Sequence, residues 1–258
     1  MKRPSFLNLP KPIVACILSE RTIADAVATI KNGEFEGAPA FAVHMEALGK
    51  ANLTDENLLR IIQATKRPVM MLHYRPNPCP FTEEERVELL LRCAKHGAAA
   101  IDFTADTFDP SPMEFSDKPD AVDKQRRAID QAHALGAEVV MSSHIYEPRT
   151  CEQVLEQMKA VEKRGVDFAK IVTITDTEED FLEAVKTTLA LRREMKIPFI
   201  HLCGGKFGLA HRFLSPKLGN AVTFCVSRYT ECFTTIQPHL TNMLTVLDKN
   251  PWHIDLYE

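Results

Sequence analysis

The sequence predicts an α/β protein folded as a (β/α)8 TIM barrel, on three observations. Short apolar runs alternate with longer amphipathic segments eight times within 258 residues, which is the count and length of such a barrel. The turn after the first run, Ser19-Glu20-Arg21-Thr22, lacks the glycines expected in a doubly wound sheet that binds a dinucleotide. No linker or low-complexity segment divides the chain, so we expect one domain over residues 1–258.

The first half of the chain supplies four strand and helix pairs. The strands are expected at residues 12–18, 38–45, 69–73 and 98–104. The first two helices are expected at 22–31, ending near Gly33, and at 55–65. The third helix has the clearest limits, because Thr82 and Glu85 form a capping box and Gly97 provides the end. A long polar loop with several prolines precedes the fourth helix, which ends near residue 135.

The second half repeats the same alternation. Its strands are expected at residues 138–143, 168–174, 198–203 and 221–226. Its helices are expected at residues 151–164, 178–195, 207–213 and 238–247. Gly165 ends the first of these helices, and the pair Gly204-Gly205 follows the third strand.

Composition excludes several classes of protein. A net charge of −4 and a pI near 6.2, with no stripe of lysine and arginine, argue against nucleic-acid binding. No apolar run reaches the roughly 18 residues of a membrane span. The first twelve residues lack the apolar core of a signal peptide, so a cytoplasmic location is expected. The seven cysteines form no CxxC motif and predict buried free thiols.

Lys170 lies within the apolar run Asp167-Phe168-Ala169-Lys170-Ile171-Val172-Thr173-Ile174. A strand enclosed on both faces buries its side chains, and an ammonium group buried there needs partners or a lowered pKa. A neutral lysine can attack a ketone and form a Schiff base, which makes Lys170 a candidate nucleophile. The alternative is that Lys170 lies at the strand end and extends its ammonium group to water.

Polar residues at the carboxyl ends of the other strands are the remaining candidates, because barrel enzymes carry their chemistry there. These residues are Glu20, His44, Glu46, His73, Arg75, Asp102, Thr104, Ser142, Ser143, His144, His201, Arg212 and Gln237. His144, one strand from Lys170, could move protons beside an imine, or could be a structural histidine. Arg212, beyond the two glycines, offers a planar fork for a carboxylate, or could be a surface charge. No set has convincing metal-ligand spacing, so a mechanism without metal or cofactor is expected.

These landmarks together resemble the type I 3-dehydroquinate dehydratase family. The resemblance rests on Ser143-His144, Asp167 to Ile171, Gly204-Gly205 with Arg212, Gly219-Asn220 and Gln237, in that order. It implies a (β/α)8 barrel, often a homodimer, that dehydrates 3-dehydroquinate to 3-dehydroshikimate in aromatic amino-acid biosynthesis. The resemblance also implies that Lys170 forms the Schiff base, His144 moves the protons, and Arg212 with Gln237 binds the substrate carboxylate.

The first half departs from the family pattern. The family motif E-x-R-x-D becomes Ala42-Val43-His44-Met45-Glu46, and D-x-E becomes Asp102-Phe103-Thr104. Arg75 is kept, but His73 replaces a threonine, prolines from residue 76 to 80 replace an acidic residue and a glycine pair, and Phe233 replaces a serine. The imine-forming and carboxylate-binding residues are therefore retained, whereas those that contact the substrate hydroxyls are changed.

Three functions are compatible with this pattern. The leading hypothesis is a lyase of this family, with His44, Glu46, His73 and Arg75 shaping the distal part of the substrate pocket. A site that has lost hydroxyl-binding residues should accept a different substituent, so a dehydratase or aldolase acting on a related keto acid is the first alternative. A barrel that only binds a small molecule is the second, although such a protein has no evident need for a buried amine beside an imidazole.

Overall fold

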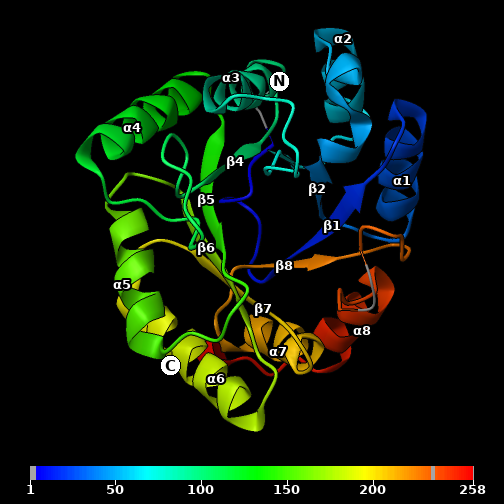
Figure 1. The fold of residues 1–258 in the computed structure, drawn as a ribbon. Coiled ribbons are helices and arrows are strands. Elements are labelled where there is room, and N and C mark those ends of the chain that lie inside the picture. The colour runs from blue at the N-terminus through cyan, green and yellow to red at the C-terminus, as the bar shows by residue number, and fades with distance from the viewer. Residues whose placement is uncertain (1–3, 234–235, 258) are drawn as a thin grey trace.

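The computed structural model describes residues 4–233 and 236–257; the expected domain limits at residues 1 and 258 lie outside this part. Eight parallel strands form one sheet in the order β7-β6-β5-β4-β3-β2-β1-β8. The sheet curls into a barrel surrounded by helices (Figure 1). This arrangement confirms the predicted (β/α)8 fold.

The strands and helices alternate along the chain as the sequence predicts. The strands are β1 Ile13–Ser19, β2 Ala40–His44, β3 Val69–Leu72, β4 Ala100–Thr104, β5 Glu138–His144, β6 Phe168–Ile174, β7 Phe199–Gly204 and β8 Val222–Cys225. The helices are α1 Ile23–Phe35, α2 Asp55–Ile62, α3 Glu83–Lys95, α4 Pro119–Ala134, α5 Cys151–Glu162, α6 Glu178–Glu194, α7 Gly208–Leu214 and α8 Leu240–Lys249. Short 3-10 turns occur at Glu46–Leu48, Lys50–Asn52, Ser215–Leu218 and Ile254–Tyr257.

Two local features explain where helices start and end. The capping box predicted at Thr82 and Glu85 is present at the start of α3. The prediction that α1 ends near Gly33 is wrong by two residues, because the helix continues to Phe35. Gly33 is needed for packing instead: a Cβ atom there would lie 2.9 Å from the Phe41 ring and 3.2 Å from Cys16 Sγ.

Alternation along each strand divides the core into two layers. One layer fills the barrel and includes Ile17, Leu72, Phe168 and Phe224, while the other lies between the strands and the helices. Because successive strand side chains point to opposite faces, even-numbered residues of β2 to β8 point into the barrel. The position of a residue in this alternation therefore decides whether it can reach the interior.

Asn220 joins the two strands at the ends of the sheet order. Its Oδ1 accepts a hydrogen bond from the His201 backbone at 2.8 Å, and its Nδ2 donates to the Val222 carbonyl at 2.8 Å. The Ala221 backbone also donates to the Phe199 carbonyl at 2.9 Å. These contacts bring β7 next to β8 and complete the wall of the barrel.

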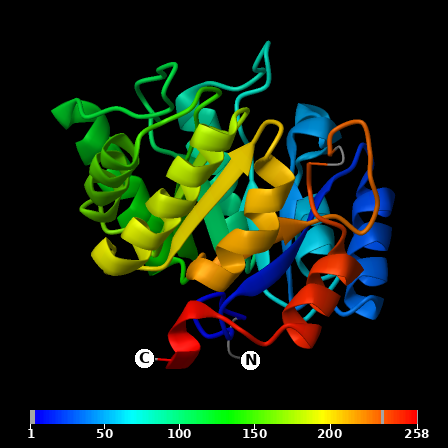
Figure 2. The same ribbon diagram turned by 90° about the horizontal axis from the view of Figure 1, so that it is seen from below.

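The end of the barrel at which the strands begin is covered by the first described residues of the chain. Phe6 is fully buried in the interior layer, and its backbone N donates to Glu138 Oε2 at 2.9 Å. Figure 2 shows this segment beneath the barrel, at the end from which the strands begin. The interior is therefore open at the carboxyl ends of the strands.

Two predictions from composition can be compared with the structure. All seven cysteines are free, as predicted, and five of them are buried: Cys16, Cys93, Cys151, Cys203 and Cys225. Cys79 is partly exposed and Cys232 is exposed, so the prediction of burial is wrong for these two. Among the helices of residues 4–233 and 236–257, none is both long and apolar enough to cross a membrane.

Candidate active site

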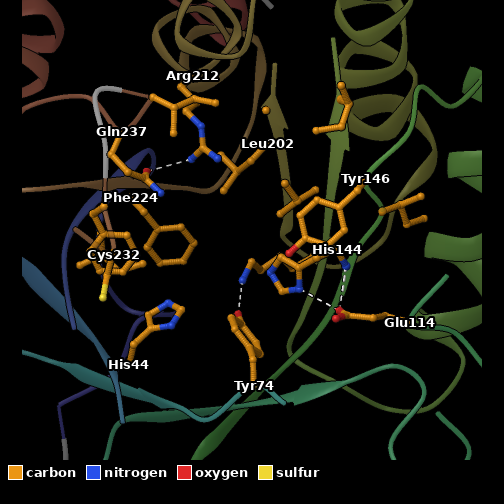
Figure 3. A pocket seen from close by; sticks show the side chains of 18 of the residues that line it. His44, Tyr74, Glu114, His144, Tyr146, Leu202, Arg212, Phe224, Cys232 and Gln237 are labelled. Carbon is orange, nitrogen blue, oxygen red and sulfur yellow. Dashed lines mark hydrogen bonds and ion pairs between the residues drawn. The ribbon is translucent and has the colours of Figure 1, made fainter. Parts of the chain in front are cut away.

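A cavity of about 460 Å³ opens at the carboxyl ends of the strands. Of the predicted site residues it is lined by His44, Arg75, His144, Lys170, Arg212 and Gln237. Figure 3 shows Arg212 and Gln237 on the opposite side of the cavity from Tyr74 and His44. The barrel thus gathers residues that are up to 193 positions apart, from His44 to Gln237, into one site.

Lys170 points from the middle of β6 into this cavity and is only 4% exposed. The alternative that it extends to water is therefore wrong. Its Nζ donates a hydrogen bond to the Tyr74 hydroxyl and lies 3.3 Å from Asp102 Oδ2. Burial lowers the pKa of Lys170, and the negative charge of Asp102 opposes this effect. The site thus favours the neutral amine more than water does.

Tyr74 and Asp102 form a buried polar pair beneath the amine. The Tyr74 hydroxyl donates to Asp102 Oδ2 at 2.7 Å, and the Ser142 hydroxyl donates to Asp102 Oδ1 at 2.7 Å. Burial, followed by the adjacent Asp102 carboxylate, raises the pKa of Tyr74 well above its usual value. The phenol therefore keeps its proton at neutral pH.

His144 lies at the end of β5, beside β6 and close to Lys170. In the sheet, Ser142 is the register partner of Lys170 and His144 follows two residues later. The imidazole packs edge-on against the Tyr74 ring, with 4.4 Å between ring centroids. Burial and the positive charge of Lys170 lower the pKa of His144. A neutral imidazole close to the amine is suited to accept a proton.

Glu114, in the loop between β4 and α4, determines which nitrogen of His144 is free. Its Oε2 accepts from the His144 backbone N at 2.9 Å and lies 2.8 Å from Nδ1. Because an ionised carboxylate only accepts hydrogen bonds, we assign the proton to Nδ1, which leaves Nε2 free to act as a base. Burial would raise the pKa of Glu114, but the hydrogen bond and charge of His144 produce a net decrease.

Arg212 is carried by α7 and is almost fully buried at 5% exposure. Its Nε donates to the Cys203 carbonyl at 2.9 Å, and its Nη1 donates to Gln237 Oε1 at 3.0 Å. Burial lowers the pKa of Arg212 to about 10. Both of these partners are uncharged, so the guanidinium group can pair with an anion that enters the cavity.

His44 and Glu46 form a pair at the edge of the cavity. His44 Nδ1 lies 3.4 Å from Glu46 Oε2, and the His44 ring packs edge-on against Tyr74 and Phe233. Glu46 Oε1 accepts from the Tyr74 backbone at 2.5 Å. Burial opposes ionisation of Glu46, but His44 outweighs it and lowers the pKa of Glu46 to about 2. Unlike His44, Glu46 does not line the cavity. It contacts two residues that do, His44 and Tyr74.

Arg75 lines the cavity, but two carboxylates already bind its guanidinium group. Its Nε lies 2.6 Å from Glu83 Oε1, and its Nη2 lies 2.9 Å from Asp106 Oδ1. Burial disfavours the charged form, but these two carboxylates raise the pKa of Arg75 overall. An incoming substrate anion would have to compete with both of them.

His73 and His201, two of the candidates from the sequence, lie outside the cavity, as does His211. His73 is 1% exposed and packs edge-on against Phe81, 4.8 Å between ring centroids, so its proposed place in the pocket is wrong. The physical reason is the alternation of side chains along β3. Its odd-numbered residues, Val69 and Met71, point towards the helices, and His73 directly after the strand continues that pattern. His201 and His211 meet behind the barrel wall, where Thr188 Oγ1 lies 2.9 and 3.0 Å from their ring nitrogens.

Cys203 joins those two histidines in a buried cluster whose possible ligand atoms all lie within 4.8 Å of one another. Sequence spacing did not indicate this cluster, because α7 brings His211 to β7 from the next element. The Thr188 hydroxyl already bonds to both imidazoles, and burial lowers the pKa of His201 to about 3. We therefore interpret the cluster as a network of neutral, packed side chains.

Sequence reasoning missed two residues of the site, Tyr74 and Glu114. Tyr74 could have been found by extending the alternation of β3, since Met70 and Leu72 both belong to the interior layer. Glu114 lies in an irregular loop without periodicity, where its φ is 42°, so no local signal places it beside His144.

Comparison with known proteins identifies the family. Residues 14–248 match the family model described as type I 3-dehydroquinase. A 3-dehydroquinate dehydratase of Alkaliphilus oremlandii is 30% identical over 110 residues, covering 42% of this chain and 43% of that protein. One from Geobacillus sp. strain WCH70 is 24% identical over 182 residues, covering 69% and 64%. Each of these alignments thus spans less than two thirds of the relative.

Solved structures agree with the fold over nearly the whole chain. The 3-dehydroquinate dehydratase of Geobacillus kaustophilus superposes with a TM-score of 0.81 and 18% identity, covering 96% of both chains. The type I enzyme of Clostridium difficile gives 0.79 and 14%, covering 94% of this chain and 93% of its own. The match to the family model, over residues 14–248, covers well over half of the chain, and on this evidence the chain belongs to the type I 3-dehydroquinase family.

Proposed function

We propose that this protein dehydrates 3-dehydroquinate to 3-dehydroshikimate through an imine on Lys170. The observation that carries the proposal is the buried amine of Lys170 in a cavity that also holds His144 and Arg212. Membership of the family supports the same reaction, as do relatives named 3-dehydroquinate dehydratase. The reaction needs a neutral amine, a base and a site for a carboxylate, and the cavity offers each of them.

Lys170 and His144 would divide the chemistry. The neutral amine of Lys170 attacks the substrate ketone, and loss of water gives an imine that withdraws electrons from the neighbouring carbon. His144 Nε2 accepts the proton from that carbon, and the electron pair left behind expels the hydroxyl group. The same imidazole returns its proton to the leaving oxygen, so that water departs. Hydrolysis of the imine then releases the product and restores Lys170.

Arg212 and Gln237 would hold the substrate carboxylate. The guanidinium group presents a planar set of donors that matches a carboxylate, and its hydrogen bond to Gln237 Oε1 fixes both side chains. The Gln237 amide nitrogen remains available as a second donor. Arg212 lies opposite Tyr74 and His44 (Figure 3), and Lys170 bonds to Tyr74, so a substrate anchored at Arg212 would extend its ring towards the amine.

Trapping of the imine tests this proposal directly. The protein is incubated with 3-dehydroquinate and sodium borohydride, and its intact mass is measured beside that of Lys170→Ala. We expect a covalent adduct on the wild-type protein, absent from the variant, together with formation of the conjugated product in the absence of borohydride. Absence of both the adduct and the product would overturn the proposed function.

A related keto acid with fewer hydroxyl groups is a second candidate substrate. It is favoured by the distal end of the cavity, where Phe233 packs on His44 and where two carboxylates bind Arg75. A site with few free polar groups discriminates weakly in favour of hydroxyls. Labelling of Lys170 by other keto acids but not by 3-dehydroquinate would select this candidate and keep the imine chemistry.

Other expectations from the sequence stay predictions. We propose that His44 and Arg75 shape the distal pocket, and that Glu46 acts on it through His44. One domain over residues 1–258, a homodimer and a cytoplasmic location are likewise inferred from the sequence and the family resemblance. Size-exclusion chromatography with light scattering would test the homodimer.

A further inference from the structure

Tyr74 is the side chain in closest association with the Lys170 amine, and the mechanism above gives it no role. Lys170 Nζ donates a hydrogen bond to the Tyr74 hydroxyl, which in turn donates to Asp102 Oδ2 at 2.7 Å. Figure 3 shows the Tyr74 side chain pointing into the cavity. The three groups form a continuous hydrogen-bonded chain from nitrogen to phenol to carboxylate.

The hydrogen bonds from Lys170 through Tyr74 to Asp102 offer a path for a proton that must be removed before an imine can form. A lysine that enters the reaction as an ammonium ion must lose a proton before its nitrogen can attack a carbonyl. Lys170 is 4% exposed and Asp102 is fully buried, so bulk water has little access to either group. An acceptor inside the cavity is therefore required.

Other routes for this proton are less well built. The direct contact from Lys170 Nζ to Asp102 Oδ2 is 3.3 Å, at the long end of the hydrogen-bond range. Among the described residues, the hydrogen bonds of the Lys170 amine go to Tyr74 and Asp102, whereas the free Nε2 of His144 is the base proposed for the substrate carbon. The Tyr74 hydroxyl, in contrast, accepts a hydrogen bond from Lys170 and donates one to Asp102.

We propose that Tyr74 is a further catalytic residue, which relays a proton from the Lys170 ammonium group to the Asp102 carboxylate. An N–H bond of Lys170 breaks as an O–H bond forms on Tyr74, while the original Tyr74 O–H bond breaks and its proton passes to Asp102. Tyr74 is unchanged, Lys170 becomes a neutral amine and Asp102 becomes a neutral acid. The reverse transfer resets the site after the imine is hydrolysed. This inference rests on the proposed function.

Electrostatics favours such a transfer in this position. The ion pair of Lys170 and Asp102 and the neutral pair that replaces it have the same total charge, so no net charge is created in the cavity. Removal of water disfavours the two separate ions more than the two neutral groups. Ser142, which donates to the other oxygen of Asp102 at 2.7 Å, can stabilise the carboxyl group in either form.

The test compares the rate of imine formation in Tyr74→Phe and wild-type protein between pH 6 and 9.5. The probe is 3-dehydroquinate with sodium cyanoborohydride, and adduct on Lys170 is followed by mass spectrometry. We expect Tyr74→Phe to be slower by roughly tenfold to hundredfold at pH 6.5, as for other proton-transfer groups. The deficit should shrink as the pH rises, because more of the lysine is then already neutral.

Two further variants make the result specific. Tyr229→Phe removes a phenol hydroxyl from a half-exposed tyrosine that does not line the cavity, and it should behave as wild type. Asp102→Asn accepts no proton, but it also removes the negative charge that raises the pKa of Lys170, so its deficit should fade at a lower pH than that of Tyr74→Phe. Thermal melting of each variant verifies that the compared proteins are folded.

The possible outcomes separate the relay from the proposed function. A deficit in Tyr74→Phe that fades with rising pH supports the relay. Equal rates at every pH, or a deficit that is uniform across pH, would show a packing role only and overturn the relay while leaving the imine chemistry intact. Absence of any adduct on wild-type protein would overturn the proposed function and the relay together.

Discussion

Glu114 contacts both the backbone and the ring of His144 through a single carboxylate oxygen. The distances are 2.9 Å to the backbone N and 2.8 Å to Nδ1. Glu114 itself is held in place because its carbonyl accepts from the Ser143 hydroxyl at 2.8 Å, although its φ of 42° is unusual for a residue with a side chain. The loop after β4 thus determines the orientation of a residue on β5.

Two substitutions of Glu114 should separate its charge from its hydrogen bonds. The amide oxygen of Glu114→Gln can keep both contacts, so we expect mainly a lower pKa of His144, since the negative charge that raises it is lost. The rising limb of kcat/KM against pH should then move to lower pH. Glu114→Ala should also lower kcat roughly tenfold to hundredfold, because the imidazole is no longer oriented. An unchanged pH profile in both variants would contradict this role.

Arg212→Lys should weaken substrate binding while leaving imine formation possible. A lysine keeps the positive charge but loses the planar fork, and a hydrogen bond to a charged group contributes about 1.5–3 kcal/mol. We therefore expect KM to rise roughly tenfold to hundredfold, with trapping at saturating substrate retained. Steady-state kinetics measures the effect, and Arg127→Lys on an exposed face of α4 is the matched control. A change in kcat alone would argue against a carboxylate site.

Phe233→Ser should alter selectivity at the distal end of the cavity. Phe233 packs on the His44 ring with 5.2 Å between centroids, and a serine there offers a hydroxyl group in place of apolar surface. One added hydrogen bond contributes about 0.5–1.5 kcal/mol. We expect the ratio of kcat/KM for 3-dehydroquinate to that for a less hydroxylated keto acid to rise roughly two- to tenfold. A fall in this ratio would contradict the assignment of Phe233 to substrate selection.

His201 should make the fold sensitive to acid. Burial lowers its pKa from 6.5 to about 3, so between these values the unfolded chain binds more protons than the folded one. Stability is therefore complete above pH 6.5 and decreases as the pH falls towards 3, by at most about 1.4 kcal/mol per pH unit.

Urea unfolding between pH 4.5 and 7.5 tests this expectation. In His201→Gln, the decrease in unfolding free energy over this range should be smaller than in wild type. The same substitution at His253, which is partly exposed, serves as the control. Parallel pH dependence in His201→Gln and wild type would show that another group is responsible.

The fold was more accessible from the sequence than the site. The run from Phe168 to Ile174 coincides with β6, because a buried parallel strand is written as a continuous apolar segment. Predicted helix ends were wrong where packing outweighs local preference. Gly33, for example, is needed to make room for the Phe41 ring and does not end the helix. Lys170 was indicated by its charge within an apolar strand, and Arg212 by its position after the Gly204-Gly205 turn.

The missed residues had no such signal. β3 ends at Leu72, so a reading by strand limits stops before the alternation reaches Tyr74 and assigns His73 in its place. Glu114 is brought to His144 by the path of a loop, which depends on contacts such as that with Ser143. Tertiary contacts of this kind have no periodic pattern in sequence.

The unequal pairing of the two cavity arginines has a stereochemical consequence. Arg75 is neutralised by Glu83 and Asp106, whereas the hydrogen-bond partners described for Arg212 are a carbonyl and an amide. The carboxylate of a substrate is then attracted to Arg212 and not to Arg75, while the carbonyl carbon of the same substrate bonds to Lys170. A ring fixed at two points presents a single face to the imidazole, so only one of two prochiral hydrogens should be removed.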